Sequence, residues 1–259
     1  MDEFSQLKIG FIGAGNMAYG IAQGILRAGS YIIPLFTLDA PSKNNFSPLP
    51  VAVTHSNEEV IHSFSSGLPG CQTPSDPHCP TCTLGARHPP QHIIVSVAAG
   101  VTIGTLEGLL PGGSCVMRLM PNLPCMLQEG ALLLACGTED KQEVASQLKV
   151  LLSPCGLVEV GPESWIDAHT GLSGSGVYVF AEALAEGAVK MGMPCALAQR
   201  FAAQTILGAG HLLRDGEKHP AQLKAEVCTP GGTTVYGLHA LEKGGLRAAV
   251  MGAVEAATE

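Results

Sequence analysis

The segment Pro230-Gly231-Gly232-Thr233-Thr234 contains residue types that could bind a small ligand carrying a carboxylate. Two glycines allow the backbone to approach a ligand closely, and free amides at the start of a helix can hold a carboxylate. Threonine side chains at a helix start can cap the helix or reach toward a bound molecule. The flanking runs 222–229 and 235–242 predict a helix, a glycine turn and a second helix. A capped turn between two packed helices would leave the same local pattern.

A dinucleotide-binding fingerprint lies near the N-terminus. Residues 13–18 fit the pattern Gly-x-Gly-x-x-Ala, with an apolar, strand-like run before them and a helical pattern after them. In this context Gly13 makes the turn, Gly15 admits a pyrophosphate and Ala18 permits close packing of the helix on the strand. We therefore expect the chain to bind NADH or NADPH. A fortuitous glycine turn is the alternative.

The choice between the two cofactors depends on the end of a second expected strand, at 35–38. Asp39 lies where an acidic residue could bind the ribose diol, which favours NADH. The run 40–45 offers hydroxyl, amide and cationic groups suited to a 2′-phosphate, which favours NADPH. A polar loop without either role would look the same, so the sequence supports both cofactors.

The composition is that of a globular chain with little charge. Its 259 residues are 46% hydrophobic and 14% charged, with a mean hydropathy of +0.26. A chain of this length can bury a sizeable core, as one large domain or two ordinary ones. The low charge indicates hidden surface, as in a homo-oligomer. The net charge of −8 argues against non-specific binding to nucleic acid or acidic membranes.

Targeting signals and cysteine usage favour a cytoplasmic protein. Residues 1–6 lack both a hydrophobic signal core and an arginine-rich transit pattern. No apolar run in the sequence reaches the length of a membrane span. The nine cysteines are scattered without a disulfide framework, which predicts reduced thiols.

The stretch 63–91 differs from the rest of the chain. It is rich in proline, glycine, serine and cysteine, and neither helical nor strand periodicity is present. We expect this stretch to be irregular and disordered, and to leave a parallel sheet without one interior strand. A single Cys-x-x-Cys with irregular partners is a weak metal signature, so we expect no metal there. The residues concerned are Cys71, His78, Cys79, Cys82 and His88.

The remaining periodicities divide the chain into two domains. Strand-like and helix-like segments alternate to about residue 160, which predicts a doubly wound parallel sheet of the Rossmann type with helices on its faces. From 161 to 259 the pattern is helical, alanine-rich and poor in charge, as in helices that pack between subunits. We expect a dinucleotide-binding domain over 1–160 and an all-α dimerisation and substrate domain over 161–259. The expected elements are strands at 92–100, 114–120 and 130–135, and helices at 103–110, 142–152, 181–192, 196–213 and from 234 onward.

The chain resembles the pyrroline-5-carboxylate reductases, which form proline by reducing a cyclic imine. The matching blocks are 10–18, 94–100, 120–124, 167–176 and 223–242, and the last two are highly specific. With their surroundings these blocks cover most of the chain outside 61–91. Among members of the family, the chain is most similar to the cytosolic vertebrate form.

The resemblance implies a Rossmann domain followed by a helical domain that interlocks in homodimers, which stack into a ring. In this family the substrate pocket forms at the dimer interface. Glu163, Thr233 and Thr234 match positions that contact the substrate or proline, and Glu217 aligns with an acidic residue on the substrate side. The implied cofactor contacts are Ile12, Gly13, Ala14, Gly15, Asn16, Met17, Ser42, Asn57, Val97, Ala98 and Ala99.

The implied reaction agrees with the residue types. A protonated imine is already electrophilic, so an enzyme mainly needs to hold the nicotinamide against the imine carbon. Thr234 could hydrogen-bond the ring nitrogen, while amides from Gly231 to Thr233 hold the carboxylate. We therefore interpret Thr234 and Glu217 as catalytic, and Glu163, Gly231, Gly232, Thr233 and Thr234 as substrate-binding.

Three departures from the family pattern bear on the activity of this chain. Nothing between His62 and His92 matches the family strand that contacts the cofactor. The helix after Gly176 is a few residues short, with Val177 where proline is usual, and the C-terminal domain is expected to be incomplete. A catalytically impaired member that acts only through subunit association is therefore an alternative. A β-hydroxyacid dehydrogenase is another, but the residues around Lys190 do not supply the interdomain lysine motif of that class.

Overall fold

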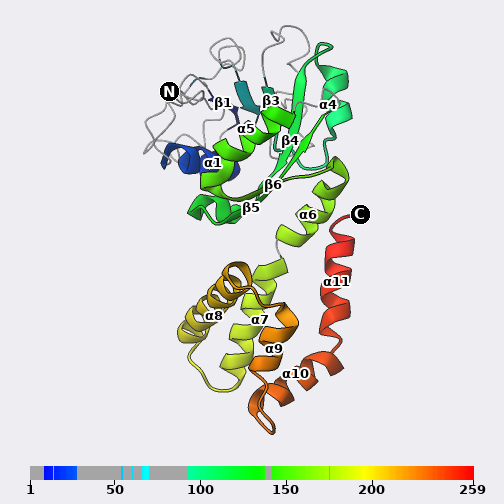
Figure 1. The fold of residues 1–259 in the computed structure, drawn as a ribbon. Coiled ribbons are helices and arrows are strands. Elements are labelled where there is room, and N and C mark those ends of the chain that lie inside the picture. Colours follow the sequence, from blue (N-terminus) through cyan, green and yellow to red (C-terminus); the bar gives the residue numbers. More distant parts are fainter. Residues whose placement is uncertain are drawn as a thin grey trace. The chain divides into compact units, whose positions relative to one another are not determined.

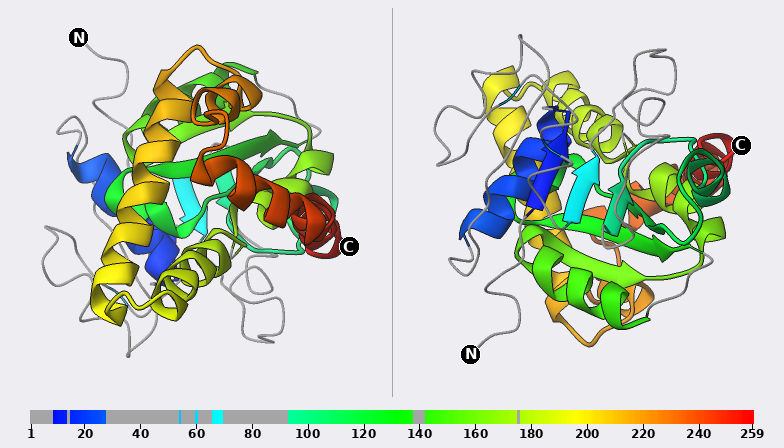
Figure 2. Two further views of the ribbon diagram at one scale, coloured as in Figure 1. Left: turned by 90° about the horizontal axis from the view of Figure 1, so that it is seen from below. Right: turned by 90° about the horizontal axis from the view of Figure 1, so that it is seen from above.

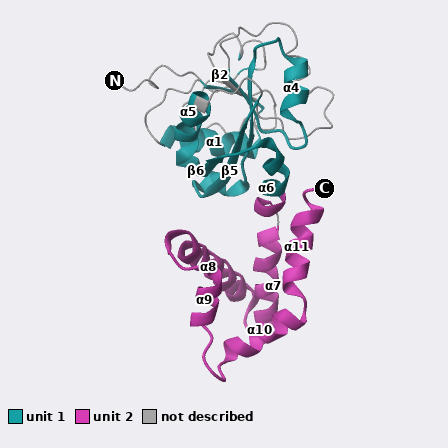
Figure 3. Cartoon of the chain, turned by 45° about the vertical axis from the view of Figure 1, so that its right-hand side comes forward, with its two compact units in different colours: residues 1–170 teal, residues 171–259 magenta. Residues whose placement is uncertain are grey.

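The computed structural model describes residues 9–13, 15–27, 54, 60, 66–69, 93–137, 142–174 and 176–259. These residues form two compact units, 1–170 and 171–259 (Figure 3). The expected boundary between 160 and 161 therefore falls earlier than the division between the units. The reason is that Ile166, at the start of helix α6 (Ile166–Ser173), is fully buried against Leu133 and Ala135 of the first unit.

The described part of the first unit is built on a sheet of six strands in the order β1-β2-β3-β4-β5-β6 (Figure 1). Neighbouring strands are parallel except for the pair β4 and β5. The strands are β1 (Ile9–Ile12), β2 (Ser66–Pro69), β3 (Ile93–Ser96), β4 (Cys115–Met120), β5 (Gly130–Cys136) and β6 (Gly156–Val160). The Rossmann-type fold is thus confirmed, with one reversal of strand direction.

The reversal between β4 and β5 has a local cause. The two strands are joined through a single short 3₁₀ turn, η3 (Leu123–Leu127), in which Pro124 occupies the first turn. A parallel connection needs a crossover of about a dozen residues or more, usually a helix, and this connection is too short to make one. The strand expected at 130–135 therefore exists but runs antiparallel to its neighbour.

Strand β2 corrects the prediction that 63–91 contains no interior strand. Ser66–Pro69 pairs in parallel with β1 on one side, where Gly10 lies opposite Gly67, and with β3 on the other (Figure 2). Backbone groups make these pairs, so two flanking strands can select a short segment whose composition gives no periodic signal. The rest of 63–91 lies outside the described residues, as do the candidate metal ligands Cys71, His78, Cys79, Cys82 and His88.

Helices cover both faces of the sheet. Successive side chains of a strand therefore belong to different cores, one on each face. On β4, Cys115, Met117 and Leu119 join the core beneath α1 (Asn16–Arg27) and α5 (Gln142–Leu152). Val116 and Met120 join a second core beneath α4 (Ile103–Leu109). Successive side chains of a strand point to opposite faces, so a strand buried on both sides reads as a continuous apolar run.

The second unit consists of helices. Its members are α7 (Gly176–Lys190), α8 (Cys195–Asp215), α9 (Pro220–Glu226), α10 (Thr233–Lys243) and α11 (Leu246–Ala256). Helices α7 and α8 pack on each other through Ala185, Ala198 and Ala202, which are buried. Many large apolar side chains on these helices stay exposed in the single chain, among them Val179, Leu184, Phe201, Leu207, Leu212 and Tyr236.

Within the described ranges, no helix is long and apolar enough to cross a membrane. In the same ranges, no group of three or more histidine, cysteine, aspartate or glutamate side chains is arranged to hold a metal ion.

Candidate functional site

The fingerprint turn between β1 and α1 has the geometry that dinucleotide binding needs. Gly13 follows the strand with φ of +97°, a conformation that favours glycine, and α1 begins at Asn16. The Tyr19 N–H donates to the carbonyl of Gly15 at 3.1 Å, while Ala18 is buried against the core. Amides earlier in this first helical turn have no partner within an α-helix, so they can meet a phosphate.

The second cofactor-side segment, Val97 to Ala99, directly follows β3. The Ala98 N–H donates to Oγ of Ser96 at 3.3 Å, and Ala98 is buried while Ala99 is exposed. Because β1, β2 and β3 are parallel, the ends of β1 and β3 lie at the same edge of the sheet. The structure therefore brings the fingerprint turn and this segment to one edge, where ligands of such sheets bind.

The expected cofactor contacts fall partly within the described residues. Ala14, Ser42 and Asn57 lie outside the described residues, as do the strand expected at 35–38 and Asp39. The structure describes the other residues that are expected to contact the cofactor, which are Ile12, Gly13, Gly15, Asn16, Met17, Val97, Ala98 and Ala99.

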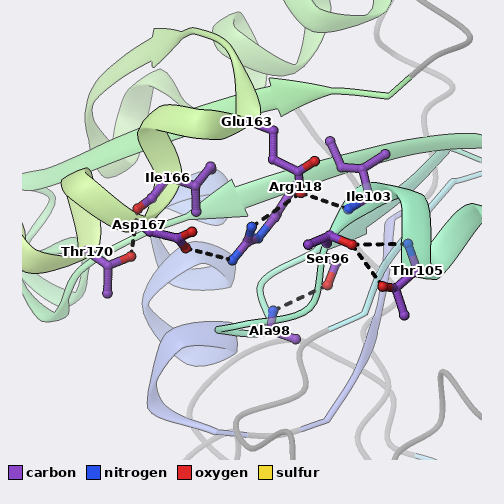
Figure 4. Close-up of polar contacts among 10 residues, drawn as sticks. Ser96, Ala98, Ile103, Thr105, Arg118, Glu163, Ile166, Asp167 and Thr170 are labelled. Carbon is purple, nitrogen blue, oxygen red and sulfur yellow. Dashed lines mark hydrogen bonds and ion pairs between the residues drawn. The ribbon is translucent and has the colours of Figure 1, made fainter. Parts of the chain in front are cut away.

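Glu163 lies in the turn η5 (Glu163–Trp165), next to the start of α4 (Figure 4). Its Oε1 accepts a hydrogen bond from the Ile103 N–H at 2.7 Å and an ion pair from Nη1 of Arg118 at 3.2 Å. The other amino group of Arg118, Nη2, contacts Oδ1 of Asp167 at 3.4 Å. Glu163 is therefore fixed beside the segment that continues from Val97 to Ala99.

The glycine turn of the second unit has the predicted form. Gly231 has φ of +69°, and Gly232 is the N-cap of α10 without a side-chain cap. The Gly232 N–H donates to the Thr229 carbonyl at 3.0 Å, and a Cβ at Gly232 would lie 2.3 Å from Oγ1 of Thr229. A side chain at Gly232 would therefore force the Thr229 side chain to move.

The first two residues of α10 are Thr233 and Thr234. Amides at these helix positions have no partner within the helix, and the helix dipole favours negative charge beside them. Glu217 lies in the same unit, exposed in the connection between α8 and α9. Within the described residues, no hydrogen bond or ion pair joins Glu217 to either threonine.

Arg118 and Asp167 were not identified from the sequence. A signal existed for Arg118, because it is the one charged residue in the apolar strand Cys115–Met120. Charged residues are rarely fully buried unless they are paired, so an arginine within such a strand indicates carboxylate partners elsewhere.

The buried thiols of the first unit do not supply a nucleophile. Burial raises the pKa of Cys155 to about 12, and the neighbouring Cys125 adds to the rise. Burial also raises the pKa of Cys125. The thiolate is the reactive form, so both groups are inert near neutral pH.

Comparison with known proteins identifies the family of this chain. The family model for pyrroline-5-carboxylate reductase dimerisation matches residues 163–259, and the model for coenzyme F420-dependent NADP oxidoreductases matches 8–64. Pyrroline-5-carboxylate reductase 3 of Danio rerio is 62% identical over 263 residues, covering 98% of this chain and 90% of the relative. The chain belongs to the pyrroline-5-carboxylate reductase family.

Other members of the family support the same assignment. Pyrroline-5-carboxylate reductase 3 of Macaca fascicularis is 50% identical over 97% of this chain and 93% of the relative. The crystal structure of the Plasmodium falciparum pyrroline carboxylate reductase, with NADP bound, matches with a TM-score of 0.85 at 28% identity. That match covers 98% of this chain and 97% of the Plasmodium chain, so the family fold extends over both units.

Proposed function

We propose that the chain reduces 1-pyrroline-5-carboxylate to L-proline with NADH or NADPH, as the last step of proline biosynthesis. The observation that carries this proposal is the 62% identity, over 98% of the chain, to pyrroline-5-carboxylate reductase 3 of Danio rerio. The fingerprint turn and the glycine turn supply independent support, since each has the backbone geometry its ligand requires.

The residues at the sheet edge fit a nicotinamide dinucleotide. The left-handed Gly13, the start of α1 and the small residues Ala98 and Ala99 offer open amides and space at the ends of two parallel strands. When bound, NADH or NADPH supplies the hydride. We assign cofactor binding to Ile12, Gly13, Ala14, Gly15, Asn16, Met17, Ser42, Asn57, Val97, Ala98 and Ala99.

The proposed substrate residues bind and orient a molecule that is already activated. The amides at the start of α10, following Gly231 and Gly232, hold the substrate carboxylate. The hydroxyl oxygen of Thr234 accepts a hydrogen bond from the N–H of the protonated imine. The carboxylates of Glu163 and Glu217 balance the positive charge of the imine, and no strong acid or nucleophile is required.

We further propose a homo-oligomer formed through the helical unit, with dimers stacked into a ring, in the cytoplasm. The dimerisation family model over 163–259 supports the dimer. So do the exposed apolar side chains of α7, α8 and α10, because patches of this kind mark protein interfaces. The net charge of −8 speaks against nucleic acid or an acidic membrane as a partner.

The proposal is tested by following the oxidation of NADH and of NADPH with pyrroline-5-carboxylate, and by a panel of β-hydroxyacids with the oxidised cofactors. We expect turnover with pyrroline-5-carboxylate and none with the hydroxyacids. Turnover of a hydroxyacid would assign a different reaction. If the chain forms stable dimers but turns over neither class, it acts only through subunit association.

A further inference from the structure

Arg118 is the largest fully buried side chain of the first unit, and the proposed chemistry gives it no role. It lies on β4, in alternation with Met117 and Leu119, and so faces the α4 side of the sheet with Val116 and Met120. Its side chain is only 2% exposed. Burying a guanidinium costs free energy unless carboxylates compensate its charge. The carboxylates that pair with Arg118 therefore indicate its role.

Arg118 makes one contact to each of two carboxylates, rather than two parallel hydrogen bonds to a single carboxylate. Nη1 meets Oε1 of Glu163 at 3.2 Å, and Nη2 meets Oδ1 of Asp167 at 3.4 Å (Figure 4). Among the described residues, Nε has no hydrogen-bond partner. A planar fork on one carboxylate would be the stronger pairing for an arginine. Here the guanidinium instead spans two carboxylates that belong to η5 and α6.

The carboxylate of Glu163 is held by one oxygen. Oε1 receives both the Arg118 contact and the Ile103 N–H, at 2.7 Å, whereas Oε2 accepts no hydrogen bond from the described residues. The side chain of Glu163 is 31% exposed. Two donors on one oxygen anchor that atom, so the second oxygen of the partly exposed carboxylate remains available to a ligand.

The hydrogen bond to Ile103 also ties Glu163 to the cofactor side. Ile103 begins α4 after the N-cap Thr102, and only Gly100 and Val101 separate Thr102 from the segment Val97 to Ala99. The Oε1 atom therefore links the segment assigned to the nicotinamide with the carboxylate assigned to the substrate. A shift of the Arg118 side chain would therefore alter the distance between the nicotinamide segment and the Glu163 carboxylate.

We propose that Arg118 is a positioning residue, which holds Glu163 so that its second oxygen faces the positive charge of the protonated imine in register with the cofactor segment. This inference rests on the proposed function, because Glu163 needs a substrate to contact. A purely structural role is the competing account, since the same contacts join β4, α4 and η5. The two accounts differ in whether the losses of kcat/KM caused by substituting Arg118 and by substituting Glu163 are additive.

The first test is a double-mutant cycle in the full-length protein with Arg118→Met, Glu163→Gln and the double variant. We expect Arg118→Met to lower kcat/KM for pyrroline-5-carboxylate by about tenfold or more, as for one hydrogen bond to a charged group. The KM for NADPH should change by less than about twofold, because the cofactor contacts themselves remain. In the Glu163→Gln background, adding Arg118→Met should cost less than about twofold, since the positioned group is already absent.

Additive losses in that cycle would overturn the proposal, because they would mean that Arg118 acts independently of Glu163. Arg118→Lys keeps a single charge at the site and should recover part of the lost kcat/KM. If Arg118→Met does not fold, Arg118→Lys takes its place in the cycle with the same two outcomes. Lys149→Met, which removes an exposed ion pair to Glu159 in the same unit, should leave the kinetics unchanged.

A second readout separates this inference from the proposed function. Trp165 is the only tryptophan of the chain, lies in η5 with Glu163 and is 58% exposed, so its fluorescence can report L-proline binding. Arg118→Met should weaken proline binding in the wild-type background and have no further effect with Glu163→Gln. If the wild type is active and Arg118→Met changes neither the affinity for proline nor kcat/KM, this inference is wrong while the proposed function stands. A wild type that neither binds proline nor turns over the imine defeats both proposals.

Discussion

Thr234 is the residue on which the proposed chemistry depends most directly. It is the second residue of α10, behind a turn in which Gly231 is left-handed and Gly232 packs closely against the Thr229 hydroxyl. Its hydroxyl oxygen can therefore face a ligand whose carboxylate rests on the same helix start. A threonine that only capped the helix would have no part in the rate of the reaction.

Replacement of Thr234 by valine keeps the shape of the side chain and removes the hydroxyl. We expect kcat to fall more than cofactor binding weakens, because one charge-assisted hydrogen bond to the reacting imine is lost, worth about 1.5–3 kcal/mol. Steady-state kinetics with pyrroline-5-carboxylate, together with calorimetric titration of NADPH, measure the two effects. Thr258→Val, which removes a hydroxyl bonded to the Val254 carbonyl, is the control. Unchanged turnover would remove Thr234 from the mechanism.

The pKa of Cys155 predicts how stability depends on alkaline pH. The thiol is buried, donates to the Ile21 carbonyl at 3.6 Å and has its pKa raised from 9.0 to about 12. At pH values below the pKa of this thiol in the unfolded chain, the thiol is neutral in the folded and the unfolded state, so its contribution to stability is fully present. Above that pKa the unfolded chain ionises first, and stability is lost as the pH rises toward the folded pKa.

The corresponding measurement is the free energy of unfolding in denaturant at about pH 8 and about pH 10. The wild type should lose more stability between these values than Cys155→Ala, which has no thiol to ionise. Cys195→Ala removes an exposed thiol and should follow the wild type. Equal pH dependence in Cys155→Ala and the wild type would contradict the raised pKa.

At the scale of elements, the turn between β1 and α1 is the part of the cofactor site that both sequence and structure support. Gly15 stands directly before the helix, where the backbone must come close to a pyrophosphate. We expect Gly15→Val to abolish dinucleotide binding while the chain stays folded. Titration calorimetry with NADPH measures the first effect and thermal melting the second. A variant that binds NADPH as tightly as the parent would show that the turn is not the cofactor site.

The strands and helices differ in how far the sequence could predict them. The alternation of β and α segments predicted α4, β4 and α5 to within one residue of their observed bounds, because buried strands and amphipathic helices carry periodic signals. It also located β1, α1 and β3, although β3 ends at Ser96 and the prediction extended to 100. Strand β2 carried no such signal and is selected by its two neighbours. Strand β6 was missed. Val158 is its only buried residue, so neither a continuous apolar run nor a full alternation marks it.

The candidate site was predicted from the sequence in part. The fingerprint and the glycine turn could be found because each is a contiguous segment with a required backbone conformation. The contact of Arg118 with Glu163 joins residues 45 positions apart, and only the fold brings them together. Pairings of this kind depend on which strand face a residue takes and on where a later turn packs, neither of which local patterns determine.

For the whole molecule, the exposed apolar side chains of the helical unit predict self-association. Phe201 on α8 is 54% exposed in the single chain. We expect Phe201→Asp to shift the protein toward monomers, because it would place a charge in an apolar interface. Sedimentation velocity measures this shift. Val150→Asp, at an equally exposed apolar position on α5, should leave the oligomer intact, and an unchanged mass for Phe201→Asp would contradict an interface at α8.

The central claim is that this chain transfers hydride to the imine carbon of 1-pyrroline-5-carboxylate. The most direct measurement uses NADPH or NADH carrying deuterium at both C4 positions, with mass spectrometry of the product. We predict L-proline with a single deuterium on the ring carbon that was the imine carbon, formed in step with cofactor oxidation and absent with Gly15→Val. Cofactor oxidation without labelled proline, or no reaction by a folded oligomer, would contradict the account.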